Sequence, residues 1–255
     1  MKKRAVLIES GFLKTQKVQL PGAVEDIKKW QTHLQADYAG AWTPEEIVVL
    51  SAPKERDVLK LIKADQGLDF ALVVFSGHGF HHDRRELDYV CLNNNENVLV
   101  TSFVPSCRSI VVIDACRSIM SSGSGGRATE TRSQPTVFAD GGAIVSPSKQ
   151  HYRKFYEDNV LNVQGQALLQ SCSVGEVANE NPFNGGAYTV ALLREAQKWH
   201  EQASPFQSPS EEGRIQTIEQ AHDGAVNAVG KQFIYQLPEI SGAGLHLPFA
   251  VRPAS

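Results

Sequence analysis

The sequence predicts an α/β fold in which a mainly parallel sheet is covered by helices on both faces. Short and mainly apolar segments occur at residues 4–8, 46–50, 70–75 and 110–113. Segments with helical spacing of apolar residues separate the first three of them. Strands that are buried on both faces are continuous apolar runs, and their alternation with helices favours a parallel sheet.

The helices and a hairpin in the first half follow from local patterns. Residues 21–36 carry apolar side chains at helical spacing, and Pro21 at their start is typical of a helix N-terminus. Residues 54–64 repeat this amphipathic pattern. A small hairpin is expected from residues 89–92 and 98–101, because the polar run NNNEN lies between them.

The second half begins with a segment of different composition. Residues 119–150 contain the run SSGSGGRATETRSQP, which is rich in serine, glycine and threonine and predicts a mobile surface loop. A loop of this length inside a domain is uncommon and often functional. Further elements are expected after it: helices at 152–161 and 187–199, a weaker helix at 215–229, and strands at 167–171 and 245–251.

Composition narrows the class of protein. A net charge of −3 gives no reason to expect a nucleic acid or an anionic membrane as partner. No apolar run approaches the ~18 residues of a transmembrane helix. In the N-terminal MKKRAVLIES, the apolar run before Glu9 is too short for the core of a signal peptide. The cysteines form no CxxC pair and no zinc-finger spacing. We therefore expect a cytoplasmic protein with reduced thiols and no structural metal.

The candidate catalytic residues lie at the ends of two predicted strands. The strand at 70–75 ends in Ser-Gly-His-Gly, with His78 between two glycines, and the strand at 110–113 ends in Asp-Ala-Cys, with Cys116. A nucleophilic thiol needs a nearby base and backbone N–H donors for the developing oxyanion. His78 is the candidate base, and the N–H groups of Gly79 and Cys116 are the candidate oxyanion donors.

Taken singly, each residue has a plainer interpretation. A histidine at a strand end usually forms structural hydrogen bonds, and a cysteine after an apolar strand is usually buried filler. The combination is more informative, because parallel strands of one sheet bring their carboxyl ends to the same edge.

The two strand ends resemble a known family. The segments FSGHG and VVIDACRS are similar to those of the caspase and metacaspase superfamily of cysteine peptidases, in particular its bacterial metacaspase-like members. LLQSCSVGEVANE at 168–180 and GGAYTVALL at 185–193 resemble the small-subunit region of that family, and QLPEISG at 236–242 resembles its closing segment. The resemblance covers about residues 4–251.

This resemblance implies an architecture and a reaction. The fold would be a caspase-like three-layer sandwich whose mostly parallel central sheet has about six strands. It would form one peptidase domain, with a large-subunit-like part at 1–118, the loop at 119–150 and a small-subunit-like part at 151–255. His78 would be the general base and Cys116 the nucleophile, and peptide bonds would be hydrolysed through a thioester. The spacing of 116 − 78 = 38 residues is shorter than the roughly 50 of caspases.

The preferred substrate residue follows from Asp114, two residues before the cysteine. In a turn its carboxylate can face the bound side chain, and an acidic pocket attracts Arg or Lys. A turn-capping role is the alternative. Metacaspases usually carry a second aspartate two residues after the later Ser-Cys, but this chain has Val174 there. Glu176 and Glu180 are the candidate substitutes, and Cys172 is expected in the pocket or core.

The resemblance also raises processing and metal binding. Family members are often cut between their two parts, and the 119–150 loop offers Arg127, Arg132 and Lys149 as cleavage sites. A plain surface loop is the alternative. Many metacaspases need calcium, but HHDRRELD at 81–88 has no tight run of oxygen ligands. We therefore expect no cofactor, with calcium dependence left open.

Three functions remain in view. The first is an Arg- or Lys-directed cysteine endopeptidase acting on a protein substrate, monomeric, and activated by a partner chain or by loop cleavage in a bacterial stress or antiphage programme. The second is a non-enzymatic caspase-like scaffold that binds a partner protein. The third is a cysteine hydrolase or redox sensor on a flavodoxin-like sheet, against which stands the lack of a resolving cysteine near Cys116 in the sequence.

Overall fold

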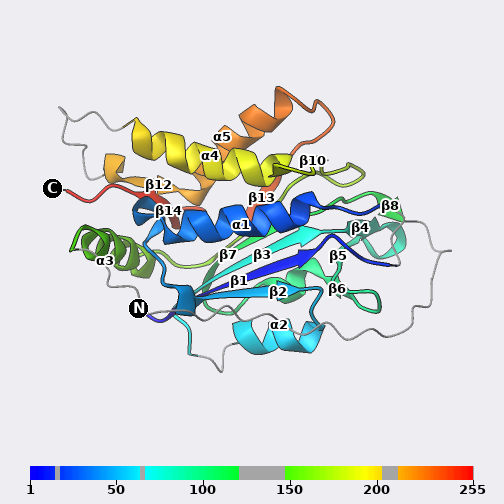
Figure 1. The fold of residues 1–255 in the computed structure, drawn as a ribbon, viewed down its shortest axis with the longest axis horizontal. Coiled ribbons are helices and arrows are strands. Elements are labelled where there is room, and N and C mark those ends of the chain that lie inside the picture. Colours follow the sequence, from blue (N-terminus) through cyan, green and yellow to red (C-terminus); the bar gives the residue numbers. More distant parts are fainter. Residues whose placement is uncertain (15–17, 64–66, 121–146, 203–211, 255) are drawn as a thin grey trace.

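The computed structural model describes residues 1–14, 18–63, 67–120, 147–202 and 212–254. Its centre is a six-stranded sheet in the order β13-β9-β7-β3-β1-β2 (Figure 1). The strands are β1 (Lys3–Ser10), β2 (Ile47–Ser51), β3 (Phe70–Gly77), β7 (Arg108–Asp114), β9 (Gln166–Gln170) and β13 (Glu239–Gly242). Only β13 runs antiparallel to its neighbour. The predicted mostly parallel sheet is confirmed.

Strand β3 shows why these sequences form buried strands. All eight of its residues are buried, and its side chains alternate between two cores. Leu72 and Val74 face one core, whereas Val73 and Phe75 face the other. A strand with both faces covered requires apolar residues at every position, since successive side chains point to opposite faces.

Helices and a small sheet cover the two faces of the central sheet. Helices α1 (Gly22–Gln35) and α4 (Ala187–Glu201) lie on one face, with α5 (Ile218–Gly230) packed against α4 (Figure 1). Helix α2 (Glu55–Ile62) covers the other face through Val58 and Ile62. These layers confirm the three-layer α/β sandwich.

A second sheet extends the end of the molecule toward which the parallel strands point. It has the order β6-β5-β4-β8 and contains β4 (Gly79–His82), β5 (Leu87–Cys91), β6 (Asn97–Leu99) and β8 (Ile119–Met120). The antiparallel pairing of β5 with β6 is the predicted hairpin. Strand β4 continues directly from the His78 turn, so this sheet fixes the direction in which the turn leaves β3.

The second half differs from the prediction at three places. Helix α3 (Pro147–Leu161) begins five residues before the predicted start, so residues 147–150 are helical rather than loop. Residues 215–217 form strand β12 (Ile215–Thr217) instead of the first turn of a helix. They pair with β14 (Pro248–Val251), which is therefore not part of the central sheet.

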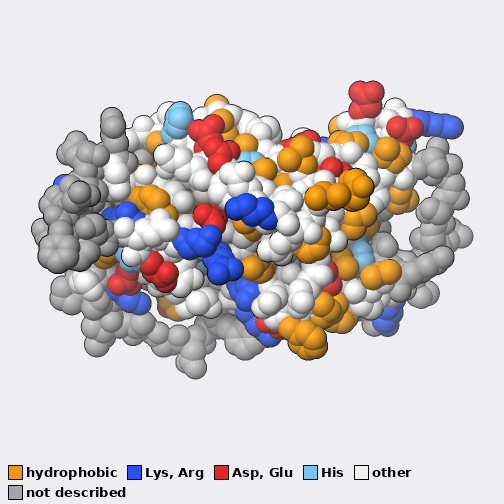
Figure 2. Space-filling view, turned by 90° about the horizontal axis from the view of Figure 1, so that it is seen from above, with side chains coloured by type: hydrophobic (Ala, Val, Ile, Leu, Met, Phe, Trp, Pro, Cys, Tyr) orange, Lys and Arg blue, Asp and Glu red, His pale blue; other side chains and the backbone are white. Residues whose placement is uncertain are grey.

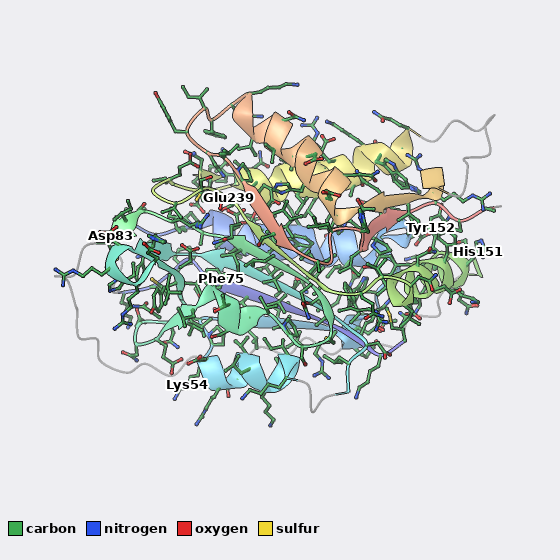
Figure 3. The ribbon with its side chains drawn as sticks, turned by 180° about the vertical axis from the view of Figure 1, so that it is seen from behind. Lys54, Phe75, Asp83, His151, Tyr152 and Glu239 are labelled. Carbon is green, nitrogen blue, oxygen red and sulfur yellow. The ribbon has the colours of Figure 1, made fainter. Side chains whose placement is uncertain are left out.

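The two ends of the central sheet hold different elements. Helix α3 lies at the amino ends of the parallel strands (Figure 1). Seen from behind, His151 and Tyr152 of α3 are at the opposite end of the molecule from Asp83, which follows β4 (Figure 3). None of the described helices is both long and apolar enough to cross a membrane.

Candidate active site

Close backbone contacts explain the glycines on both sides of His78. A Cβ on Gly77 would lie 2.7 Å from the Ser10 carbonyl oxygen, and one on Gly79 would lie 2.8 Å from the Cys116 carbonyl oxygen. Neither position has room for a side chain. The turn between β3 and β4 therefore packs against the end of β1 and against the backbone of Cys116.

Pairing of adjacent parallel strands brings His78 and Cys116 to one edge of the sheet. The register of β3 against β7 places Ser76 beside Asp114, two residues before His78 and Cys116 respectively. The predicted neighbourhood of these residues is therefore present. The described residues show no hydrogen bond between the thiol and the imidazole: Cys116 Sγ lies 3.9 Å from Ala178 O, and His78 Nε2 lies 3.3 Å from Gly11 O.

The protonation of the two groups follows from their surroundings. Burial lowers the pKa of His78, although hydrogen bonds to the Gly11 and Val18 backbone oppose this. Burial raises the pKa of the Cys116 thiol, and the negative charges of Asp114 and Glu180 raise it further. At neutral pH the imidazole is thus a free base and the thiol is protonated, which is the starting point for general-base catalysis.

Asp114 lines a small cavity beside Cys116. Its side chain is buried, and its Oδ2 accepts hydrogen bonds from Thr189 N at 3.1 Å and Thr189 Oγ1 at 2.7 Å. Thr189 lies in the first turn of α4, where the helix dipole favours a carboxylate. Asp114 therefore lines the cavity and also bonds the first turn of α4, and its role in substrate binding stays a prediction.

Sequence reasoning missed Asp26, the second buried carboxylate of this cavity. Asp26 lies on α1 and accepts hydrogen bonds from Ser76 Oγ at 2.6 Å and Gly186 N at 2.8 Å. Burial raises its pKa well above the usual value, and the charge of Asp114 adds to this. The signal was a single carboxylate on the apolar stripe of a helix, three residues after Ala23 and four before Trp30.

Glu180 is the third carboxylate at the cavity. Burial and the charge of Asp114 raise its pKa, while a backbone hydrogen bond from Gly22 lowers it. The cavity holds about 20 Å³, close to the space of one water molecule. It is lined by Leu20, Asp26, Ser76, Gly77, Asp114, Ala115, Cys116, Ala178, Asn179, Glu180 and Gly186.

No positive charge balances these three carboxylates within the described part of the chain. None of the ion pairs among the described residues includes Asp26, Asp114 or Glu180. Carboxylates that are buried together without a cation repel one another, and each resists ionisation. A cationic side chain entering this cavity would relieve that repulsion.

Two other predicted residues lie outside the cavity. The Glu176 carboxylate accepts hydrogen bonds from Ser173 N at 3.0 Å and Leu237 N at 2.7 Å, so it ties two loops together. Cys172 is fully buried, with Sγ 3.4 Å from Ala115 O, and burial raises its pKa to about 12. Glu176 is therefore not a substitute for the missing pocket aspartate, and Cys172 is a core residue beneath the site.

Arg117, directly after the nucleophile candidate, anchors this strand end. Its guanidinium contacts Asp88 at 2.8 Å, the Cys172 carbonyl oxygen at 3.0 Å and Glu239. Asp88 also accepts a hydrogen bond from Gln170 and pairs with His81. Asp88 is an acidic residue of the run HHDRRELD, and both of its carboxylate oxygens bond to protein groups. Among the described residues, no group of three or more His, Cys, Asp or Glu side chains is arranged so that it could hold a metal ion.

The candidate cleavage residues are mostly outside the described residues. Arg127 and Arg132 fall in the range 121–146, which the structure does not describe. Lys149 lies in the first turns of α3 and pairs with Asp37 at 3.7 Å. A helical segment at the amino ends of the strands is a poor protease substrate, since cleavage requires extended backbone. Lys149 is therefore the weakest of the three candidates.

Comparisons with known proteins identify the family and the fold of this chain. A family model described as the caspase domain matches residues 2–247. The crystal structure of caspase-1 from Spodoptera frugiperda is similar in fold, with a TM-score of 0.57 and 13% sequence identity, over 94% of this chain and 86% of that chain. A search of curated proteins gave no match.

The family model covers nearly the whole chain, and the chain therefore belongs to the caspase domain family of cysteine peptidases. The similarity to the insect caspase, at its low identity, supports the same fold. The caspase-like resemblance and the α/β sandwich predicted from the sequence are both confirmed.

Proposed function

We propose that this chain is a cysteine endopeptidase that cleaves its protein substrate after Arg or Lys. The observation that carries the proposal is the group of three carboxylates, Asp26, Asp114 and Glu180, around a cavity at the Cys116 thiol. An Arg guanidinium would supply the missing positive charge and donate hydrogen bonds to paired carboxylate oxygens. A pocket for Asp would require cations at these positions.

The proposed reaction uses Cys116 and His78. The imidazole accepts the thiol proton, and the thiolate attacks the carbonyl carbon of the scissile peptide bond. The N–H groups of Gly79 and Cys116 stabilise the oxyanion. The imidazolium then protonates the leaving amine, and a thioester remains. Water, activated by His78, hydrolyses this thioester and regenerates the thiol.

The geometry around Cys116 gives weaker support to a second function, that of a non-enzymatic caspase-like scaffold. The cavity is too small for a side chain, and His78 contacts a backbone oxygen instead of the thiol. A caspase-like scaffold without activity would also have this arrangement. The presence of both His78 and Cys116 supports the enzyme.

The deciding experiment compares fluorogenic peptides ending in Arg, Lys or Asp, with wild type and Cys116→Ala, with and without calcium. Cleavage after Arg or Lys that disappears in the variant is the expected result. Cleavage only after Asp would retain the peptidase and overturn the acidic pocket. Unchanged cleavage in Cys116→Ala would overturn the nucleophile. Calcium in the assay tests the proposal that no metal is needed.

Activation by a separate protein, or by cleavage within residues 119–150, belongs to the same proposal. The small volume of the cavity, about 20 Å³, supports it, because a substrate side chain needs more space than this and therefore requires a rearrangement. Incubation of the pure protein followed by mass spectrometry tests self-cleavage, and an intact chain in an active preparation would count against it.

A further inference from the structure

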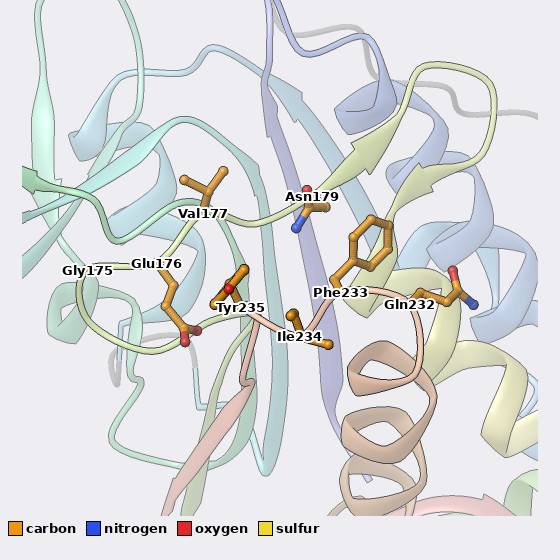
Figure 4. Close-up of a pocket in the computed structure, with 8 residues that line it drawn as sticks. All are labelled: Gly175, Glu176, Val177, Asn179, Gln232, Phe233, Ile234 and Tyr235. Carbon is orange, nitrogen blue, oxygen red and sulfur yellow. The ribbon is translucent and has the colours of Figure 1, made fainter.

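Residues 175–180, here called the covering segment, separate two hollows of very different size. On one side is the catalytic cavity of about 20 Å³, which Ala178, Asn179 and Glu180 help to line. On the other side is a groove of about 560 Å³, lined by Gly175, Glu176, Val177 and Asn179 and by residues 232–235 (Figure 4). Asn179 borders both.

The covering segment lies directly on the candidate nucleophile. The Ala178 carbonyl oxygen is the hydrogen-bond acceptor at 3.9 Å from Cys116 Sγ. The backbones of Arg117 and residues 175–176 are also joined, from Arg117 N to Glu176 O and from Gly175 N to Arg117 O. Cys116 is partly buried, and this segment covers one side of its thiol.

Gln236, which directly follows the groove residues 232–235, holds the covering segment through its buried side chain. Its side chain is almost fully buried, and its Oε1 accepts hydrogen bonds from both Asn179 N and Asn179 Nδ2 at 3.0 Å. Its Nε2 donates to Ser171 O at 2.9 Å, which fixes the amide to the end of β9. One glutamine thus connects the sheet to the segment that covers Cys116.

The surroundings of this contact leave room for movement. Val177, Ile234 and Tyr235 are exposed, the last two by 78% and 79%. Figure 2 shows apolar side chains gathered toward the end of this face that carries β10 (Glu180–Asn181). A segment shifted toward the groove would bury part of this apolar surface, which would offset the lost hydrogen bonds.

We propose that Gln236 is a positioning residue that latches the covering segment over Cys116. Residues 175–176 stay bonded to Arg117, and the site opens when the Gln236–Asn179 bonds and the Ala187 N–Asn179 O bond break, so that residues 177–179 move into the groove. This inference rests on the proposed function for its biological meaning, because opening would admit the substrate side chain to Asp26 and Asp114. The latch itself is tested by access to the thiol, independently of peptide cleavage.

The test measures the alkylation rate of Cys116 by iodoacetamide, quantified by peptide mass spectrometry so that the other cysteines are distinguished. Gln236→Leu removes every latch bond, and Asn179→Ala removes the side-chain bond from a less buried position. We expect the rate to rise roughly tenfold in the first variant and about threefold in the second. Gln35→Leu is the matched control, since Gln35 is exposed at the end of α1 and lines neither the groove nor the cavity.

The outcomes separate the latch from the proposed function. Folded Gln236→Leu and Asn179→Ala with wild-type alkylation rates would overturn the latch, as would an equal rise in Gln35→Leu. If Gln236→Leu does not fold, as judged by thermal unfolding, Asn179→Ala decides alone. Faster alkylation together with faster cleavage of Arg peptides supports both proposals. Faster alkylation without cleavage of any peptide supports the latch and counts against the peptidase.

Discussion

At the amino ends of the parallel strands, the buried charges are paired, whereas at the carboxyl ends two buried carboxylates in the cavity beside Cys116 have no cationic partner among the described residues. Lys3 is buried, and its Nζ lies 3.0 Å from the Glu157 carboxylate and 4.7 Å from the centroid of the Trp42 ring. Arg153 pairs with Glu46 and, at 3.0 Å, with Glu157. At the other end, Asp26 and Asp114 are equally buried and accept hydrogen bonds only from neutral groups.

The difference indicates what each end is for. Paired buried charges contribute to a specific and stable arrangement, since removing one partner leaves the other without compensation. Unpaired buried carboxylates raise the free energy of the folded state, and an arrangement of this kind is typical of sites that bind a charged ligand. The amino end therefore stabilises the fold, and the carboxyl end holds the unpaired carboxylates that a cationic side chain of the proposed substrate would contact.

The largest expected effect concerns activity at the carboxyl end. Asp114→Asn should lower kcat/KM for an Arg peptide roughly 100-fold, because the substrate cation would lose a buried charge partner. Steady-state kinetics with the Arg peptide measures this. Asp83→Asn, an exposed carboxylate near the same end, should leave the rate unchanged. Equal rates in Asp114→Asn and wild type would contradict the proposal that the carboxylates at the carboxyl ends bind a cationic substrate residue.

The next effect concerns stability at the amino end. Glu157→Gln should reduce the free energy of unfolding by about 2 kcal/mol, since Lys3 and Arg153 would both lose a charge partner. The melting temperature should fall by about 5 °C, with cleavage unchanged. Asp158→Asn is the matched control: its pair with Lys154 is exposed, so a change below about 0.5 kcal/mol is expected. Similar losses in both variants would mean that burial of the network does not matter.

The pH dependence of stability sharpens the contrast. Burial raises the pKa of Asp26, so between its usual and its raised pKa the folded state binds more protons than the unfolded state. The free energy of unfolding must therefore fall as pH rises through this interval. Asp26→Asn should be more stable than wild type at pH 7.5, with a difference of melting temperatures that shrinks toward pH 4. A difference that is constant with pH would show that Asp26 is not protonated more readily in the folded state.

The smallest effect concerns the thiol. Because the pKa of Cys116 is raised, its alkylation rate should level off at a higher pH than that of a cysteine in a short peptide, whose pKa is about 8.5. Alkylation rates of the wild-type protein across pH 6–10, with glutathione as reference, measure this shift of the pH profile. A profile shifted to acid would indicate an imidazolium–thiolate pair, contrary to the separate contacts of His78 and Cys116.

The fold was largely predictable, because its central strands are short and apolar on both faces. Strands such as β3 and β7 admit no other placement, and their parallel pairing brings His78 and Cys116 together. The exceptions have local causes. Ile215 and Thr217 are β-branched and pair with β14, whereas the helical pattern of the following residues suggested one continuous helix.

The candidate site was predictable only where chemistry and strand ends coincide. Asp114 was found because it lies two residues before Cys116. Asp26 was not, since a carboxylate on a helix is ordinarily exposed, and only the packing of α1 against Gly186 shows that it is buried. Glu176 was assigned to the pocket from its charge, but its carboxylate satisfies backbone N–H groups of two loops, a role that depends on long-range contacts.

The position of β9 and β13 in the central sheet has a practical consequence. Both strands come from residues after 146, yet β9 pairs with β7, and Glu239 of β13 contacts Arg117 next to the nucleophile candidate. The sheet therefore joins two portions of chain by backbone pairing and ion pairs that need no covalent connection. Polypeptides corresponding to residues 1–120 and 147–255, produced together, should assemble into one particle, which makes this fold a natural starting point for a split reporter.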